Sequence, residues 1–513
     1  MKKSRLQNSI LNFTSGLAYR LLHMLLSFAI RTVFIYCLSA DYLGINGLYG
    51  NILTMLSLAE LGFGVAMVYS LYQPLATNDQ LKLAQLMGLY KQVYRIIGTV
   101  ILFLGLALVP FLDVLIKDPP NVDGLTFYYL IFLGNTVLSY WFFAYRNAIL
   151  QADQKVYLIT GLQGLFHLIK SVIQILLLLL LRNYTVFLLV QSFSTIAQNI
   201  TTAIVTRRHY PGIFQKAPPL PEQDRKRIFA DVRALMIQRV CFVALNGTDS
   251  LITSAFVGIR WVGLVSNYQL VIDSISGILS QFTSAISASM GNFFAQEDKD
   301  AGYRLFLRVD FISFWLYSFC FVALITLLNP FVTLWLGSEF TMAQSVVLWL
   351  GLRFFVACLM NTFSTVRYSR GLFVQSQLRP LVAAVMNIVL SIWLSHPFGI
   401  SGILMATVIT RLCVNLWHHP LIIHRDGFQR SVKPYYRLWL GRFVLIAALA
   451  LIMAAISRLI LAGGVTIWNF ALLTILTAII PNGILLLLYR NNENFAYFLD
   501  LITKFLQKLR RRK

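Results

Sequence analysis

Apolar runs of about 20 residues recur from one end of the 513-residue chain to the other. Each run is long enough to cross the hydrocarbon core of a bilayer, which is roughly 30 Å thick. Only 12% of the residues are charged, whereas soluble proteins carry about 25%. Because so few charges cannot cover a water-soluble surface, the sequence predicts an all-α polytopic membrane protein.

The hydropathy pattern predicts about fourteen transmembrane helices. The expected spans are 12–37, 43–71, 86–116, 125–148, 155–181, 184–206, 232–258, 266–292, 303–328, 343–366, 376–396, 399–422, 440–460 and 466–488. Loops rich in Lys and Arg alternate with short loops that are poor in them, so the positive-inside rule places both termini in the cytoplasm. The net charge of +23 is therefore interpreted as a membrane signature, and no nucleic-acid partner is expected.

Enzymatic activity is not expected. The outer loops do not exceed about a dozen residues, which leaves no room for an external domain that polymerises sugars. The sequence has no nucleotide-binding loop, so ATP is not expected to supply energy directly. The five cysteines all fall inside apolar runs, where they are expected to be small core residues. We therefore predict neither catalytic residues nor a metal site.

Two stretches of the sequence resemble each other. Segment 42–49 aligns with segment 261–268, an offset of 219 residues between positions 42 and 261, and the same offset pairs Arg20 with Arg239. Six predicted spans in each copy imply two parallel, pseudo-symmetric six-helix lobes with the substrate site between them. The predicted domains are the N-terminal lobe 1–206, the cytoplasmic linker 207–231, the C-terminal lobe 232–422, and 423–513 with helices 13 and 14 and a basic cytoplasmic tail.

Polar residues occupy one face of several predicted spans. The longest stripe belongs to the eighth span and runs from Ser266 through Gln269 and Asp273 to Gly291. Small polar residues in lipid often serve only helix packing. Arginines need another explanation, because a charge at the bilayer centre costs about 2.5–3.5 kcal/mol and normally faces a wet cavity or a partner.

Embedded cations outnumber embedded anions, which predicts a positively charged cavity. Arginine suits phosphate because its planar fork donates two parallel hydrogen bonds, and amides can bind sugar hydroxyls. Glu60 is expected to pair with Arg20. Arg20 and Arg239 are expected to hold an anionic head group from facing walls. The predicted substrate-binding residues are Arg20, Arg31, Arg239, Arg353, Arg411, Glu60, Asp273 and Gln269.

A family resemblance rests on the first 90 residues and on the repeat. Segments 41–48, 51–53, 57–64 and 69–76 resemble the bacterial polysaccharide flippases of the multidrug/oligosaccharidyl-lipid/polysaccharide exporter superfamily. The resemblance implies a polyprenyl-pyrophosphate-linked oligosaccharide, flipped from the inner to the outer leaflet of the bacterial cytoplasmic membrane by alternating access. Implied partners are membrane lipids, a polysaccharide polymerase and glycosyltransferases, which together make capsule or exopolysaccharide.

The related lipid II flippases have cavity arginines on helix 1, which correspond to Arg20 and Arg31. Some have a sodium site between helices 7, 11 and 12. Its counterparts here are Asp249, Asn387, Ser391 and Thr407, with Ser391 at the position of a family aspartate. Coupling to Na⁺ or H⁺ is left open, and no other cofactor is expected.

Three alternatives remain from the sequence. One is a cation-coupled multidrug-type exporter of the same fold, against which the arginines argue. The second is a lipid II flippase. The third is a membrane polysaccharide polymerase, against which the short outer loops argue.

Overall fold

A computed structural model describes residues 5–60, 63–117, 122, 124–215, 217–296, 299–370, 372, 379–497 and 499. Within these ranges, the side chains of residues 5–10, 58, 59, 65, 231, 234, 235, 237–246, 281–289, 291–296 and 368 lie outside the description. The described residues form helices and connecting turns without any strand. The all-α class predicted from the sequence is thus confirmed.

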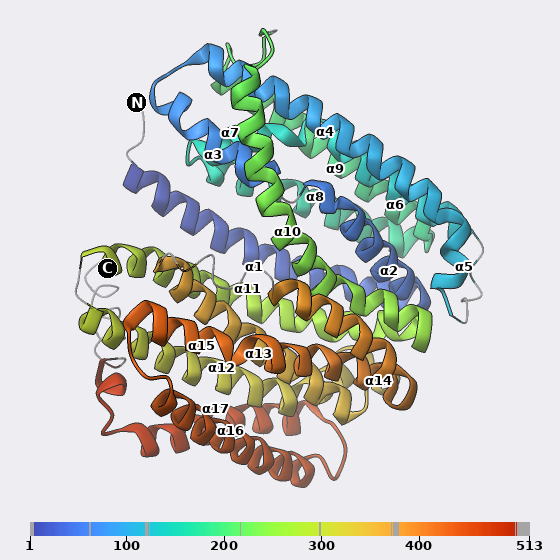
Figure 1. Ribbon diagram of the computed structural model, residues 1–513. Coiled ribbons are helices and arrows are strands. Elements are labelled where there is room, and N and C mark those ends of the chain that lie inside the picture. Colours follow the sequence, from blue (N-terminus) through green and yellow to red (C-terminus); the bar gives the residue numbers. More distant parts are fainter. Residues whose placement is uncertain are drawn as a thin grey trace, which may run out of the picture. The chain divides into compact units, whose positions relative to one another are not determined.

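The helices follow one another through short connections (Figure 1). They are α1 (Arg5–Cys37), α2 (Ala40–Leu56), α3 (Phe63–Ala76), α4 (Gln80–Leu108), α5 (Leu112–Leu115), α6 (Leu125–Trp141), α7 (Asn147–Ala152), α8 (Val156–Leu181), α9 (Tyr184–His209), α10 (Glu222–Ile252), α11 (Ile259–Gln296), α12 (Lys299–Leu336), α13 (Gln344–Ser369), α14 (Arg379–Thr410), α15 (His418–Ile422), α16 (Lys433–Ile460) and α17 (Ile467–Tyr489). Polar caps fix several starts: Asp79 accepts a hydrogen bond from the Lys82 amide at 2.9 Å before α4, and Asn183 and Thr466 cap α9 and α17 in the same way. Such caps satisfy amides that have no partner within the helix.

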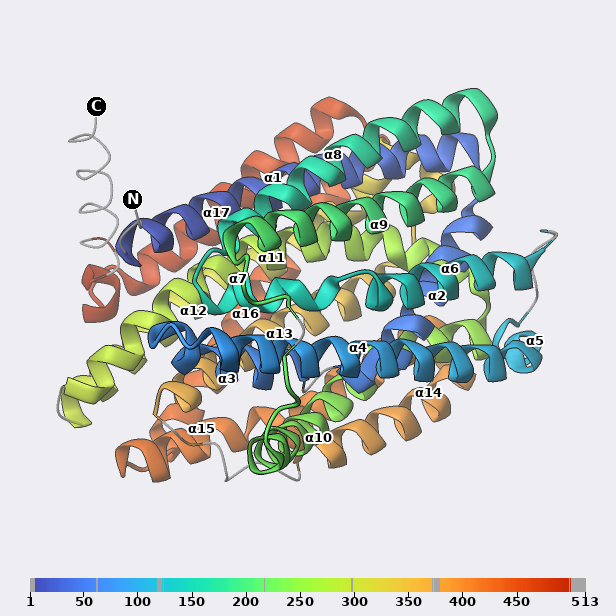
Figure 2. The same ribbon diagram turned by 90° about the horizontal axis from the view of Figure 1, so that it is seen from above.

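The chain divides into two compact units, Met1–Ser266 and Asn267–Lys513. In the first unit, α1 packs on α8, and α8, α9, α6 and α4 follow one another side by side (Figure 2). The helix α10 packs against α2 and α3 and so belongs to this unit. The unit boundary reflects contacts and not the repeat, so the predicted lobes 1–206 and 232–422 remain predictions.

In the second unit, α12 is the central helix. It packs against α13, α16 and α17, and α13 in turn packs against α14 and α15. Its central position explains why it is so apolar and so well buried along its length.

The number of continuous spans differs from the predicted fourteen. Among the described residues, ten helices are long and apolar enough to cross a membrane, or eleven if the pair Leu125–Trp141 and Ala144–Ala152, bent by 46°, counts as one. The predicted span 43–71 is interrupted by the 3₁₀ turn Ser57–Glu60. The span 232–258 falls mainly in α10, which is the most polar of the long helices.

Two further predicted spans appear as one helical segment. From residue 379 on, the spans 376–396 and 399–422 lie in Arg379–Phe428, which counts as a single span of 50 residues; residues 376–378 lie outside the described residues. Gly399, with φ 55° and ψ −132°, breaks the helical geometry between them. A positive φ is readily adopted by glycine because it has no Cβ, so the kink falls where the sequence predicts the end of one span.

Glycines at equivalent repeat positions mark a close helix contact in the first unit. A Cβ at Gly44 on α2 would collide with the carbonyl oxygen of Ile259, and a Cβ at Gly263 on α11 would lie 2.7 Å from the carbonyl oxygen of Ala40. Ala40 and Ile259 are themselves 219 residues apart in the sequence. The contact between α2 and the start of α11 is therefore reciprocal.

Candidate functional site

Four predicted site residues form one hydrogen-bonded chain in the second unit. Arg353 on α13 donates from Nη2 to Oε1 of Gln269 on α11 at 2.7 Å. Gln269 donates from Nε2 to Oδ1 of Asp273, one turn further along α11, at 2.6 Å. Arg411 donates from Nη1 to the carbonyl oxygen of Arg353 at 3.2 Å. Residues far apart in the sequence thus meet as two guanidinium groups, an amide and a carboxylate, and we call these four residues the arginine cluster.

Backbone irregularity helps to position the arginine cluster. Arg411 begins a π-helical stretch, Arg411–Leu416, directly after α14. A π-bulge inserts an extra residue into the turn and redirects the side chains that follow, and such bulges are frequent at functional sites. Arg411 is buried whereas the side chain of Asp273 is exposed. The cluster therefore runs from the interior of the unit to its surface.

The first unit holds Arg31 and Arg20 on α1. Arg31 donates from Nη1 to Oγ of Ser266 at 2.7 Å, so it joins α1 to the start of α11. The Arg20 side chain is exposed. Arg239 lies on α10, and its side chain is outside the described residues. The expectation that Arg20 and Arg239 face one another therefore stays a prediction.

Glu60 has different partners from those predicted. Its carboxylate accepts hydrogen bonds from the hydroxyl groups of Tyr94 on α4 and Tyr140 on α6, the latter at 2.5 Å. Tyr90 donates to the Tyr94 hydroxyl at 3.1 Å. The 3₁₀ turn that ends at Glu60 thus directs its carboxylate toward α4 and α6. The predicted pair with Arg20 stays a prediction.

Three of the four residues proposed for cation coupling lie in the second unit. Asn387 on α14 donates from Nδ2 to Oγ1 of Thr407 at 3.0 Å. Within the described part of the chain, Asn387 Oδ1 and Ser391 Oγ are buried and have no hydrogen-bond partner. Hard cations bind oxygen ligands, so these oxygens fit a small cation, although they bring no charge. Asp249, the charged member of the set, is buried in the first unit.

Two serines of the α11 stripe, Ser266 and Ser280, donate to carbonyl oxygens of their own helix. Ser266 Oγ donates to the carbonyl oxygen of Gly263 at 2.7 Å, and Ser280 Oγ donates to that of Gly277 at 2.8 Å. This bonding to the preceding turn is typical of serines inside helices. The side chains of Ser284 and Ser287 lie outside the description. Exposure of the stripe to a cavity remains a prediction.

The second unit contains a buried ion pair that we did not predict from the sequence. Arg442 on α16 donates from Nη1 to Oδ2 of Asp310 on α12 at 2.5 Å, and Tyr435 donates to Oδ1 at 2.6 Å. An aspartate inside the apolar run 303–328 and an arginine inside the run 440–460 could have indicated this ion pair. The pair fixes α16 on α12.

Comparison with known proteins adds the fold family. No family model and no curated protein matches the sequence. A solved inward-facing multidrug resistance MATE family transporter of the MOP superfamily matches with a TM-score of 0.60, at 16% identity, over 81% of this chain and 99% of that one. The chain has the fold of the MOP-superfamily transporters. The lipid II flippase MurJ in an inward closed conformation matches over 95% of this chain and 99% of that one, with a TM-score of 0.58 and 16% identity.

The MOP fold and the apolar helices together identify a multi-pass membrane protein. The low identity means that the likeness extends to the fold and not to any substrate. The choice of substrate must therefore be argued from the residues of this chain.

Proposed function

We propose that the protein is a flippase that moves a polyprenyl-pyrophosphate-linked oligosaccharide from the inner to the outer leaflet of the bacterial cytoplasmic membrane. It does so by alternating access, for the synthesis of a cell-surface polysaccharide. Glycosyltransferases that build the oligosaccharide act before it, and a polysaccharide polymerase acts after it. Both termini lie in the cytoplasm.

The arginine cluster is the observation that carries this proposal. Arg353 and Arg411 supply two permanent positive charges beside the amide of Gln269. A pyrophosphate needs guanidinium forks to replace its hydration in a low-dielectric site. A sugar needs amide and carboxylate groups for its hydroxyls, and Gln269 and Asp273 provide them. One cluster thus offers both kinds of recognition that a lipid-linked sugar requires.

A multidrug-type exporter shares the fold and is the first alternative, and a lipid II flippase is the second. Drug exporters that take cations would be opposed by Arg353 and Arg411, because like charges disfavour binding in a region of low dielectric. Lipid II shares the polyprenyl pyrophosphate and differs only in the sugar and peptide. The experiment must therefore separate the three substrates directly.

Coupling to Na⁺ is part of the proposal. Asn387, Ser391 and Thr407 would hold the ion, which would supply the energy of its gradient when bound. Coupling-ion sites in transporters of this architecture lie near the middle of the membrane at broken helices. The kink at Gly399 lies between Ser391 and Thr407 in the sequence. The proposed ligands therefore flank a break in the helix.

The test is a flipping assay with purified protein in proteoliposomes. A fluorescent polyprenyl-pyrophosphate oligosaccharide is placed in both leaflets, and a membrane-impermeant quencher reports the outer fraction over time. We expect protein-dependent exchange that Arg353→Ala reduces about tenfold or more, the loss expected for charge-assisted hydrogen bonds. Fluorescent lipid II and a fluorescent cationic drug form the comparison arms.

Faster movement of the cationic drug than of the oligosaccharide would overturn the proposal in favour of a multidrug exporter. Faster movement of lipid II would favour a lipid II flippase. Mass spectrometry of a deletion strain gives an independent check, because the unflipped polyprenyl-linked oligosaccharide should accumulate in the cells.

A further inference from the structure

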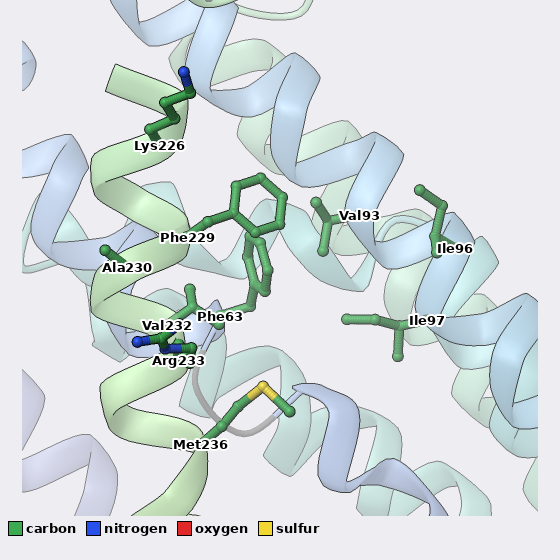
Figure 3. A pocket seen from close by; sticks show the side chains of 10 residues that line it. All are labelled: Phe63, Val93, Ile96, Ile97, Lys226, Phe229, Ala230, Val232, Arg233 and Met236. Atoms are coloured by element: carbon green, nitrogen blue, oxygen red, sulfur yellow. The ribbon is translucent and has the colours of Figure 1, made fainter. Parts of the chain in front are cut away.

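A cavity of about 660 Å³ lies in the first unit, between α10 and α4, with Phe63 at the start of α3 beside it (Figure 3). Its volume is within the range of pockets that hold drug-sized ligands. The residues that line it are mainly apolar: Phe63, Val93, Ile96, Ile97, Phe229 and Met236. None of the site residues predicted from the sequence is among them. We call this cavity the α4–α10 groove.

The α10 side of the groove combines apolar and basic residues on one face. Lys226, Phe229, Ala230 and Arg233 all line the groove and follow a spacing of three, four and seven residues, which places them on the same side of a helix. Figure 3 shows Lys226 before Phe229 and Arg233 after it along α10. The groove is therefore apolar inside and positively charged along α10.

Two apolar residues of the α4–α10 groove, Phe229 and Ile96, are exposed, whereas Phe63, Val93 and Ile97 are buried. The rings of Phe63 and Phe229 meet edge to face, with centroids 5.2 Å apart, and both point into the space between α10 and α4 (Figure 3). Phe229 is 44% exposed and Ile96 is 54% exposed. Exposed apolar surface of this kind marks a binding site or a contact with lipid.

An ion pair joins the first turns of the two helices that form the α4–α10 groove. Lys82, in the first turn of α4, forms an ion pair with Asp224, in the first turn of α10. Lys226 lies two residues after Asp224 on α10, so the basic side of the groove begins next to this ion pair. The same end belongs to the basic loops that the sequence predicts to be cytoplasmic. The groove thus starts near the predicted inner surface and extends along both helices away from it.

The charges of the α4–α10 groove are available to a ligand. Among the described residues, Arg233 forms no hydrogen bond or ion pair. Lys226 pairs with Glu222 at 2.8 Å, and both side chains are more than two thirds exposed, so water and salt screen the pair strongly. The two cations are seven residues apart, which is about 10 Å along a helix. A pyrophosphate is shorter than this spacing, so the long side chains of Lys226 and Arg233 must reach toward each other to bind both phosphates.

We propose that the α4–α10 groove is a loading site for the lipid end of the substrate: its apolar residues hold a polyprenyl chain, and Lys226 and Arg233 hold the pyrophosphate. This inference rests on the proposed function, since it names the part of the same substrate that binds here. The polyprenyl chain enters from the bilayer, so it is held by van der Waals contacts with the apolar side chains and not by removal from water. The two cations favour a diphosphate over the single phosphate of a membrane phospholipid.

Photo-crosslinking in lipid nanodiscs tests the proposal. The probe is a polyprenyl pyrophosphate with a diazirine in its chain, and mass spectrometry identifies the labelled peptides. We expect label on residues 93–97 and 229–236, displaced by unlabelled polyprenyl pyrophosphate. The double variant with Lys226→Ala and Arg233→Ala should reduce this labelling about tenfold or more, as expected for the loss of charge-assisted hydrogen bonds.

Two controls make the result specific. Arg225→Ala with Arg227→Ala removes the same charge from exposed positions of α10 that do not line the groove, so it should leave the labelling unchanged. Ala230→Trp fills the groove without a change of charge and should block labelling. Equal displacement by phosphatidylglycerol would overturn the proposal, because the groove would then be a general site for anionic lipid.

The flipping assay separates this inference from the proposed function. If the wild-type protein flips the oligosaccharide and the groove is not labelled, the loading site is wrong and the function stands. If the groove is labelled with the expected specificity and no oligosaccharide is flipped, the binding site stands and the function is wrong.

Discussion

At the scale of single residues, Asp310 and Arg442 show how a charge is held inside an apolar helix bundle. The side chain of Asp310 is 2% exposed and that of Arg442 is 4% exposed. Tyr435 donates a second hydrogen bond to the carboxylate, and the Arg442 guanidinium lies 4.6 Å from the centre of the Phe314 ring. Each charge is therefore compensated by its partner and by neighbours on α12 and α16.

Removing one member of this pair should destabilise the protein. Asp310→Ala leaves Arg442 as a buried charge without its carboxylate, which typically costs about 3–5 kcal/mol. We expect a clear fall in the melting temperature of the purified protein, measured by intrinsic fluorescence. The double variant Asp310→Leu with Arg442→Leu should recover most of the loss, because both charges are absent. An unchanged melting temperature for Asp310→Ala would contradict the pairing.

The arginine cluster leads to a different expectation, a change in transport without a change in stability. Arg353→Lys keeps the positive charge but loses the planar fork that donates to Gln269. We expect flipping to fall about tenfold at normal protein abundance. Arg458→Lys, at an exposed position near the end of α16, is the matched control and should flip normally. A parallel fall in abundance for Arg353→Lys would mean that this arginine is structural.

At the scale of helices, the contact between α2 and α11 depends on glycine. A side chain at Gly44 meets backbone atoms of Ile259, which cannot rotate away as a flexible side chain would. On the same helix, a Cβ at Gly50 would have no atom within 4 Å. Gly44 and Gly50 of α2 therefore have different surroundings.

The difference can be measured with one substitution at each glycine. Gly44→Leu should separate α2 from α11 and lower the melting temperature, since overpacking commonly costs about 1–3 kcal/mol. Gly50→Leu should have little effect, or a slight stabilising one, because it adds a helix-favouring residue in open space. Equal melting temperatures for the two variants would show that the close approach at Gly44 is absent.

The oxygens on α14 predict an effect of sodium. In Ser391→Asp, a buried carboxylate should lower the melting temperature in potassium chloride, because its charge is poorly solvated. Sodium chloride at the same ionic strength should restore the melting temperature, because an ion that binds only the folded state stabilises it. Asn387→Ala in the same background should remove the response. Identical melting curves in the two salts would exclude a sodium site at these residues.

At the scale of the whole molecule, the orientation in the membrane determines the direction of transport. Loop charges predict that the turn at Thr77 is inside and the turn at Gly463 is outside. In a cysteine-free background, an impermeant maleimide added to intact cells should label Gly463→Cys and not Thr77→Cys, and both positions are exposed. Permeabilised cells should show labelling at both. The opposite pattern in intact cells would reverse the topology.

The amino-acid sequence by itself determined the membrane class, and it predicts the repeat. Apolar runs of this length satisfy their backbone groups in a bilayer only as helices, so hydropathy along the chain was sufficient for the all-α class. The offset of 219 residues was visible in the alignment of segments 42–49 and 261–268, and the reciprocal contact of Gly44 and Gly263 agrees with it. Both results depend only on spacing along the chain.

Only the tertiary structure decided which partner each embedded polar group takes. Glu60 accepts hydrogen bonds from Tyr94 and Tyr140, and Arg353 reaches Gln269 from another helix. The α4–α10 groove likewise arises from two helices that are far apart in the sequence. Periodicity tells which residues share a face of one helix, whereas a hydrogen bond or a cavity depends on the rotation and spacing of its neighbours, which packing sets.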